Sequence, residues 1–134
     1  MGPRYCQNNA PYKVRFFNFY PPHFDPPLDQ QLNPDVTVRA RGVMEKCTYC
    51  TQRIERARVG ARSAGRKIGG DEVVTACQQA CPAQAIVFGN LADPASAVSR
   101  KHADGRVYEL LHELGTRPRT AYLVKLRNPN PELA

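Results

Sequence analysis

The chain has 134 residues, which is at most one small domain, and its twelve prolines leave little sequence for a self-sufficient core. Its 19 basic and 12 acidic residues give a formal net charge of +7. No apolar run approaches the roughly 18 residues of a membrane-spanning helix, and the first residues lack the apolar segment of a signal peptide. Membrane association is therefore expected only through partners, and any export signal is expected to lie elsewhere.

The positive charge is concentrated in one segment. Residues 39–67 contain nine basic and two acidic residues, and the rest of the chain contains ten of each sign. A nucleic-acid partner is not predicted, because the segment has no groove-reading motif and Tyr49 is its only aromatic residue. A solvated helix face remains one explanation. The one we favour is that the charge offsets a nearby anionic group, such as a thiolate-ligated cluster or an acidic partner.

The first third of the chain is predicted to be a proline-rich arm. Residues 1–45 contain seven of the twelve prolines. Residues 20–27 form an extended connector in this prediction, since each proline restricts its predecessor and donates no hydrogen bond. The aromatic-rich stretch 15–20 predicts a short strand.

Helix signals follow the arm. Residues 51–64 predict a basic helix with a small apolar stripe, which Gly65 ends. A second, short helix is predicted over 73–80 and is stopped by Pro82. The apolar run 85–88 predicts a buried strand.

The last third of the chain carries weaker signals. Asp93 is the predicted N-cap of another helix, with Pro94 at its first position. A later helix is predicted to end at Gly115, and its apolar face consists of Leu110, Leu111 and Leu114. Residues 122–126 predict a last strand before the tail at 128–131.

The chemistry resides in five cysteines, which are Cys6, Cys47, Cys50, Cys77 and Cys81. The Cys47-x2-Cys50 pair brings two sulfurs close together on one loop, and Cys77 and Cys81 would share a face if that segment were helical. The odd number of cysteines and the tight pair fit disulfides poorly. Covalent haem is excluded because Thr51, not His, follows Cys50.

Two kinds of metal site fit the spacing. A zinc site made of two cysteine pairs would give a zinc-stapled binding module. Zinc ribbons usually repeat the two-residue spacing, however, whereas the Cys77-x3-Cys81-Pro82 ending matches the closing half of the bacterial ferredoxin run. The spacing favours an iron–sulfur electron-transfer module over the zinc module, and a clusterless structural remnant is the third alternative.

The chain also resembles a known family. Residues 33–39, 41–54 and 73–89 resemble the last cysteine motif of four-cluster ferredoxin-type subunits. These subunits serve molybdopterin-type oxidoreductases, polysulfide-reductase-like enzymes and alternative complex III, a membrane quinol:electron-acceptor oxidoreductase. Residues 116–123 and 127–133 resemble the tail of the alternative complex III iron–sulfur subunit. The resemblance covers nearly the whole chain.

The resemblance implies an α+β fold, namely a partial ferredoxin-like 4Fe–4S dicluster domain with a proline-rich N-terminal arm and a C-terminal helix–strand extension. In this organisation residues 1–45 hold the end of the third cysteine motif and the connector. Residues 46–90 form the fourth, cluster-binding motif, and 91–134 form the C-terminal helical extension and tail.

The resemblance also implies ligand roles. Cys47, Cys50 and Cys77 would hold three irons of one cluster, Cys81 would be the single ligand to its neighbour, and Cys6 would serve a third cluster. The implied cofactor is a 4Fe–4S cluster, or a 3Fe–4S cluster where a ligand is missing. Ala10 stands where the family's third motif has a second cysteine.

The first two motifs of the family have no counterpart in the chain. We therefore expect either a truncated or split reading frame of a larger subunit, or a separate subunit that completes its clusters against a partner. The expected partners are the upstream half of the iron–sulfur subunit and the other subunits of a membrane oxidoreductase complex. By resemblance, the complex lies on the periplasmic face of the membrane.

No catalytic residue is predicted, so whether the chain takes part in an enzyme depends on those partners. The only adjacent carboxylates in the sequence, Asp71 and Glu72, cannot converge on one site from neighbouring positions. They are expected to lie in a solvated turn.

Overall fold

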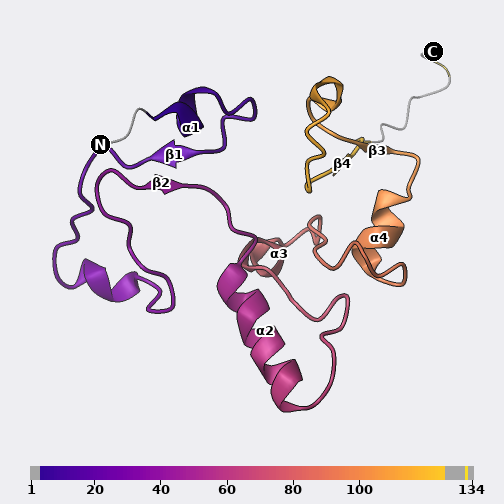
Figure 1. Cartoon of the computed structure of the whole chain (residues 1–134), viewed down its shortest axis with the longest axis horizontal. Coiled ribbons are helices and arrows are strands. Elements are labelled where there is room, and N and C mark those ends of the chain that lie inside the picture. The colour runs from indigo at the N-terminus through magenta and orange to yellow at the C-terminus, as the bar shows by residue number, and fades with distance from the viewer. Residues whose placement is uncertain (1–3, 126–131, 133–134) are drawn as a thin grey trace. The chain divides into compact units, whose positions relative to one another are not determined.

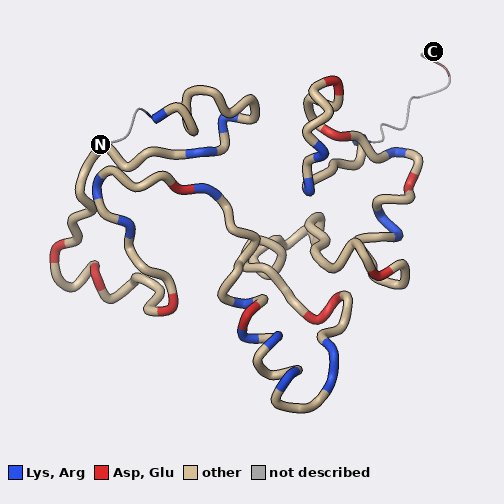
Figure 2. The backbone as a smooth tube through the Cα atoms, viewed as in Figure 1, with Lys and Arg blue, Asp and Glu red and all other residues tan. Residues whose placement is uncertain are grey.

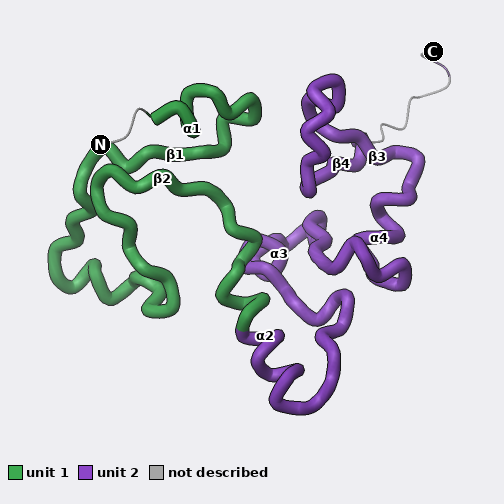
Figure 3. Tube along the Cα trace, in the orientation of Figure 1, with its two compact units in different colours: residues 1–55 green, residues 56–134 purple. Residues whose placement is uncertain are grey.

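The structure is a computed structural model that describes residues 4–125 and 132 (Figure 1). It divides into two compact units, residues 1–55 and residues 56–134 (Figure 3). The described residues contain a mixture of short helices and two-residue strands.

The first unit is built around a two-stranded antiparallel sheet. It contains α1 (Tyr5–Asn8), the 3₁₀ turn η1 (Leu28–Gln31), and the strands β1 (Phe16–Phe17) and β2 (Met44–Glu45). Phe16 pairs with Glu45 and Phe17 with Met44. The strand predicted within 15–20 is thus confirmed over two residues, but its partner strand was not predicted. The connector 20–27 is non-helical, as predicted.

Aromatic side chains form the small apolar centre of this unit. Phe17 is 4% exposed and its ring meets that of Phe19 edge to face, with 4.8 Å between the ring centroids. The guanidinium of Arg4 lies over both rings, 5.8 and 5.5 Å from their centroids. Cation–π contacts of this kind add a modest attraction to the packing of the rings.

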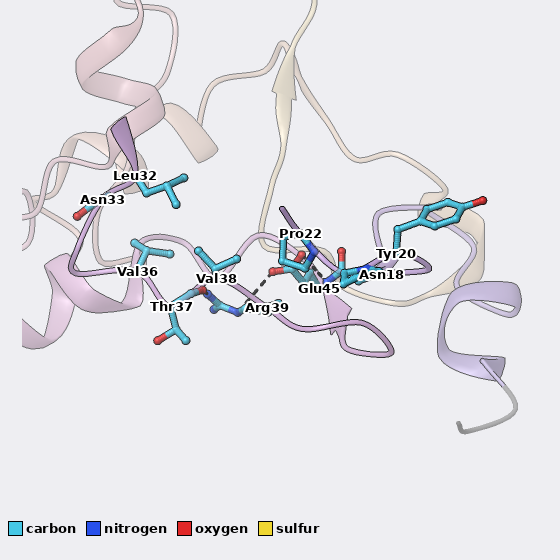
Figure 4. Close-up of a pocket in the computed structure, with 11 residues that line it drawn as sticks. Asn18, Tyr20, Pro22, Leu32, Asn33, Val36, Thr37, Val38, Arg39 and Glu45 are labelled. Atoms are coloured by element: carbon cyan, nitrogen blue, oxygen red, sulfur yellow. Dashed lines mark hydrogen bonds and ion pairs between the residues drawn. The ribbon is translucent and has the colours of Figure 1, made fainter. Parts of the chain in front are cut away.

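A hollow of about 550 Å³ lies elsewhere in the first unit (Figure 4). Its wall includes apolar side chains of the proline-rich arm, among them Leu32, Val36 and Val38. Glu45 also lines it, and its carboxylate accepts a hydrogen bond from the Asn18 side-chain amide at 2.9 Å. The Arg39 guanidinium lies 3.4 Å from the other oxygen of the same carboxylate. The hydrogen bond and the ion pair connect the arm to strand β2.

Helix α2 (Thr51–Ser63) confirms the predicted basic helix and carries the chain from the first unit into the second. Its three inward residues, Ile54, Ala57 and Ala61, recur at helical spacing. The helix ends in a Schellman motif around Gly65, which has φ 64°. In this motif the Arg66 N–H donates to the Ala61 carbonyl at 2.9 Å.

Helix α3 (Ala76–Ala80) begins three residues later than predicted. The reason is a cap: Thr75 has extended backbone, and its hydroxyl accepts the N–H of Gln78 at 3.3 Å. The helix ends before Pro82, as predicted. The strand predicted over 85–88 is wrong, because these residues have no strand partner and Ile86 and Val87 are exposed.

Helix α4 (Ala97–His102) also begins later than predicted. Asp93 is not its N-cap. The Asp93 carboxylate instead accepts the N–H of Ala95 at 2.9 Å, which makes a local turn around Pro94. Ser96 caps the helix, and its hydroxyl accepts the N–H of Ser99 at 3.2 Å.

The predicted leucine-faced helix is wrong. The only helical segment described there is the 3₁₀ turn η2 (His112–Leu114), between Leu111 and Gly115, which both have left-handed backbone with φ 54° and 62°. Leu110 and Leu114 are exposed. A short helix depends on burial of its apolar face, and the exposure of Leu110 and Leu114 shows that this face is not buried here.

Strand β4 (Tyr122–Leu123) confirms the core of the last predicted strand. It pairs antiparallel with β3 (Val107–Tyr108), with Val107 opposite Leu123 and Tyr108 opposite Tyr122. The two tyrosine rings stack with 5.6 Å between their centroids. Residue 126 of the predicted strand and the tail at 128–131 lie outside the described residues.

A polar cluster joins separate segments of the second unit. Ser96 is 1% exposed, and its hydroxyl donates to the Asn90 carbonyl at 2.9 Å. The Asn90 N–H in turn donates to the Gly70 carbonyl at 2.9 Å. Asp71 accepts the N–H of Ala97. The cluster joins three segments that are up to 26 residues apart in the sequence.

Apolar burial is scarce throughout the described residues. The buried apolar side chains among them are Phe17, Ala61 and Val73. Many large apolar side chains are exposed, including Val14, Phe16, Tyr20, Leu28, Leu91, Leu110, Leu114 and Val124. This matches the expectation from composition that the chain has little core of its own, and exposed apolar surface on this scale is typical of a contact surface.

Candidate metal centre

The Cys47–Cys50 loop has an uncommon backbone. Tyr49 and Cys50 both lie in the left-handed region, with φ 57° and 55°. The Tyr49 N–H donates to the Cys47 sulfur at 3.4 Å. A left-handed conformation costs a residue with a Cβ about 1–2 kcal/mol, and two such residues in succession point to a loop whose shape serves a function.

The same loop starts helix α2. The Cys50 carbonyl accepts the N–H groups of Arg53 and Ile54 at 2.9 and 3.1 Å. Cys47 is exposed and Cys50 is half-buried. The two thiols therefore occupy a tight turn at the helix N-terminus, where both can be reached from outside the unit.

Positive charge adjoins this loop. The Lys46 ammonium donates to the Cys47 carbonyl at 2.7 Å and lies 5.8 Å from the centroid of the Tyr49 ring. Helix α2, which follows, carries four arginines (Figure 2). Cations near the loop would offset the negative charge of a thiolate-ligated metal centre.

The second cysteine pair lies at the two ends of α3. Cys77 is in the first turn, with its sulfur 3.2 Å from the hydroxyl of Thr75, which is 3% exposed. Cys81 is the C-cap and has extended backbone, and its sulfur accepts the Ala85 N–H at 3.4 Å. Cys77 and Cys81 were expected to share a face only if one helix carried both, and this condition is not met because α3 ends at Ala80.

Cys6 lies in α1 and is exposed. Its carbonyl accepts a hydrogen bond from the Arg15 guanidinium at 3.4 Å.

The structure places the five candidate ligands in different units. Cys6, Cys47 and Cys50 lie in the first unit, and Cys77 and Cys81 lie in the second. None of the five forms a disulfide. Within each unit, the described His, Cys, Asp and Glu side chains do not gather in threes that could hold a metal ion. The joint ligand set of Cys47, Cys50 and Cys77 stays a prediction.

Three cysteine sulfurs have hydrogen-bonding neighbours from within their own motif. The neighbours are the N–H of Tyr49, the hydroxyl of Thr75 and the N–H of Ala85. Hydrogen bonds to sulfur are one of the means by which proteins set the potential of an iron–sulfur cluster. The cysteine motifs and their neighbours thus have the features of iron–sulfur ligand loops.

Comparison with known proteins supports this chemistry. The chain is similar to iron–sulfur subunits of oxidoreductases. It is 41% identical over 126 residues to the menaquinone reductase iron–sulfur cluster-binding subunit of Nitratidesulfovibrio vulgaris, and the match covers 92% of this chain and 49% of that protein. No protein-family model matches the chain.

Two further relatives come from different enzymes. The Hdr-like menaquinol oxidoreductase iron–sulfur subunit 1 of Archaeoglobus fulgidus is 38% identical over 125 residues, which cover 91% of this chain and 42% of that protein. A sulfite dehydrogenase subunit of Allochromatium vinosum is 34% identical over 123 residues, which cover 92% and 39%. The chain therefore spans about half the length, or less, of these three relatives.

These relatives are subunits of larger oxidoreductases. Among the helices of the described residues, none is both long and apolar enough to cross a membrane.

Sequence reasoning missed Thr75. The signal was present, because Thr75-x-x-Gln78 is a capping-box pattern that places the helix start at Thr75. The same hydroxyl that caps α3 lies beside the Cys77 sulfur. The capping box thus indicates a helix that begins directly after Thr75, with the Thr75 hydroxyl close to Cys77.

Proposed function

We propose that this chain is an electron-transfer module that binds iron–sulfur clusters through its cysteines. It would act within the iron–sulfur subunit of a quinol-oxidising or molybdopterin-type membrane oxidoreductase. One observation carries the proposal: a Cys-x2-Cys and Cys-x3-Cys-Pro pattern lies in a chain that aligns over 92% of its length with an iron–sulfur cluster-binding subunit.

The residues present fit such a cofactor. Thiolates are the ligands that iron–sulfur clusters take, and the five cysteines here form no disulfide and are at least partly exposed. The Cys47–Cys50 turn holds its shape at a backbone cost that metal ligation would offset. A bound cluster supplies one-electron transfer. The chain's own groups would fix the sulfurs and set the potential through the neighbours of Cys47, Cys77 and Cys81.

The cluster type and fold follow from the family resemblance. We propose 4Fe–4S clusters, with Cys47, Cys50 and Cys77 in one ligand set, Cys81 ligating a neighbouring cluster and Cys6 a third. The fold proposed for the cluster-binding part is a partial ferredoxin-like dicluster domain. The departure of Cys81 from the helix that carries Cys77 is compatible with separate clusters.

The proposed partners are an upstream half of the same type of subunit and further subunits of the complex. The exposed apolar side chains of both units support a covered surface. Alternative complex III is the complex we propose, on the resemblance of residues 116–123 and 127–133. Attachment to the periplasmic face, through partners, is proposed on the same resemblance.

Anaerobic reconstitution tests the proposal. The chain, expressed alone, would be loaded with iron and sulfide and assayed for iron, acid-labile sulfide and zinc, together with an absorption spectrum. We expect at most one labile cluster per chain, with broad visible absorption that bleaches on reduction. Five thiolates are too few for two fully ligated four-iron clusters. Stoichiometric zinc without visible absorption would replace the proposal with a zinc module.

A further inference from the structure

Helix α2 concentrates positive charge on exposed positions. It carries Arg53, Arg56, Arg58 and Arg62 against Glu55, so four positive charges less one negative leave +3 over 13 residues. All four arginines are exposed. Basic residues run along the helix in Figure 2.

The arrangement of the helix leaves its charged side outward. The apolar stripe of Ile54, Ala57 and Ala61 is turned inward, and Ala61 is 2% exposed. These positions span about 60° of the helix circumference at about 100° per residue. The stripe is narrow, so most of the circumference of α2 is polar and open.

The charge distribution in α2 is unfavourable for the stability of the helix. Arg53 lies in the first turn, where the positive end of the helix dipole disfavours cations. A helix face that is merely solvated usually mixes both signs of charge and places acidic residues near its start. The charge pattern of α2 therefore departs from that of a merely solvated face.

The residue type indicates the ligand. All of the cations in α2 are arginines, and the planar guanidinium binds carboxylates through two parallel hydrogen bonds. Phospholipid is a weaker match, because surface-bound helices insert large apolar residues and only Val59, 62% exposed, is available on the open side of α2. Nucleic acid is a weaker match, since α2 has no aromatic side chain to stack on bases.

We propose that α2 is the docking helix for an acidic surface of a partner protein. Since α2 begins directly after Cys50, a docked partner would lie beside the cysteine loop. Docking of a partner is a property separate from cluster binding. Its test measures only the binding of an acidic ligand, so the docking proposal can fail while the proposed function stands.

The test compares two charge variants of the full chain. One is R53Q/R56Q/R58Q/R62Q on α2. The matched control, K101Q/R117Q/R119Q/K125Q, removes the same number of exposed cations from the second unit. Glutamine has nearly the helix propensity of arginine, so α2 should persist, and circular dichroism checks that it does.

The probe is a fluorescent polyglutamate peptide, with binding followed by anisotropy at low and at physiological ionic strength. We expect the α2 variant to weaken binding by about tenfold and to flatten its salt dependence, because it removes close charge pairs. The control should change affinity by less than about twofold. An equal loss in both variants would show that net charge alone attracts the peptide, and would overturn the proposal.

Two further probes separate the alternatives. Vesicles of phosphatidylglycerol and phosphatidylcholine test a lipid surface, and a short DNA duplex tests nucleic acid. At equal concentrations of negative charge we expect both to bind more weakly than the peptide. Tighter binding to either one, lost in the α2 variant, would also overturn the proposal. If the quadruple variant loses helix, R58Q/R62Q provides the same comparison with fewer changes.

Discussion

The carboxylate of Asp71 accepts the backbone N–H of Ala97 with both of its oxygens, each at 3.0 Å. Ala97 is the first residue of α4, so Asp71 satisfies an otherwise orphan donor and places negative charge at the positive end of the helix. Asp71 is therefore a cap supplied from a segment 26 residues away, and not simply a residue of a solvated turn.

Replacing Asp71 should loosen the start of α4. Asp71→Ala is expected to cost about 1 kcal/mol, the usual value of a lost helix cap, and Asp71→Asn should cost less because the amide oxygen still accepts. Hydrogen exchange at the α4 amides measures the effect. Asp29→Ala, in the first unit, serves as the control. Unchanged protection of α4 in Asp71→Ala would contradict the capping role.

Two glycines should be intolerant of a side chain. A Cβ at Gly70 would overlap with the Asp93 carboxylate, and one at Gly89 would lie 2.8 Å from the Gly70 carbonyl and 2.9 Å from Asp71. Gly89→Ala should destabilise the second unit by about 1–3 kcal/mol through overpacking, and Gly70→Ala should cost less, because the Asp93 carboxylate can move aside.

Gly60 in helix α2 is the matched control for these changes. A Cβ there meets open space, so Gly60→Ala should instead stabilise α2 by roughly 0.5–1 kcal/mol. Urea unfolding followed by circular dichroism compares the three variants. A similar loss in all three would mean that packing at Gly70 and Gly89 is not the cause.

Glu72 should make the turn at residues 66–72 sensitive to acid. The Arg66 guanidinium donates to both Glu72 oxygens, at 2.7 and 2.8 Å, and the Gly69 N–H donates at 2.8 Å. The ion-paired hydrogen bond from Arg66, followed by the Gly69 bond, lowers the pKa of Glu72 from 4.5 to about 2. The stabilisation is therefore present above pH 4.5 and is lost as the pH falls toward 2.

An NMR titration of the Glu72 carboxyl carbon measures this pKa directly. In Arg66→Gln the pKa should return toward its ordinary value, and Glu72→Gln should remove the acid-dependent loss of order at Gly69. A Glu72 pKa that stays low in Arg66→Gln would mean that the backbone bond dominates.

Cys47, Cys50 and Cys77 should behave as one ligand set. Serine at any of the three is expected to abolish most cluster loading in the reconstituted chain, because a lost thiolate removes a ligand from the cluster. Cys6→Ser is the control and should leave that cluster largely intact. Iron and sulfide content per chain, with the absorption spectrum, gives the comparison. Equal losses in Cys6→Ser and Cys47→Ser would refute the assignment.

Thr75 should tune the cluster that Cys77 binds. Its hydroxyl lies 3.2 Å from the Cys77 sulfur, and a hydrogen bond to sulfur stabilises the reduced, more negative state. Thr75→Val is expected to lower the reduction potential, whereas Thr75→Ser keeps the hydroxyl and should leave it nearly unchanged. Both variants need to be checked for loss of helix α3, because the Thr75 hydroxyl also caps this helix. A redox titration in which Val and Ser give the same potential would exclude the tuning role.

Local sequence signals decided the parts of the fold that depend only on neighbouring residues. The stripe of Ile54, Ala57 and Ala61 and the glycine at 65 were enough for α2, and Pro82 was enough to end α3. The cysteine spacing was likewise enough to favour an iron–sulfur site over a zinc site, since a ligand motif is a property of residue type and separation.

The tertiary structure alone decided what depends on contacts between distant residues. Asp93 and Ser96 are both good capping residues, and Ser96 is the one that caps α4. The Ser96 hydroxyl also donates to the Asn90 carbonyl, and the N–H of the next residue, Ala97, donates to Asp71. The apolar runs at 85–88 and 110–114 formed neither strand nor α-helix, because such runs need a surface to cover them. A short segment gains its structure by burial, and burial is a property of the fold and not of the segment.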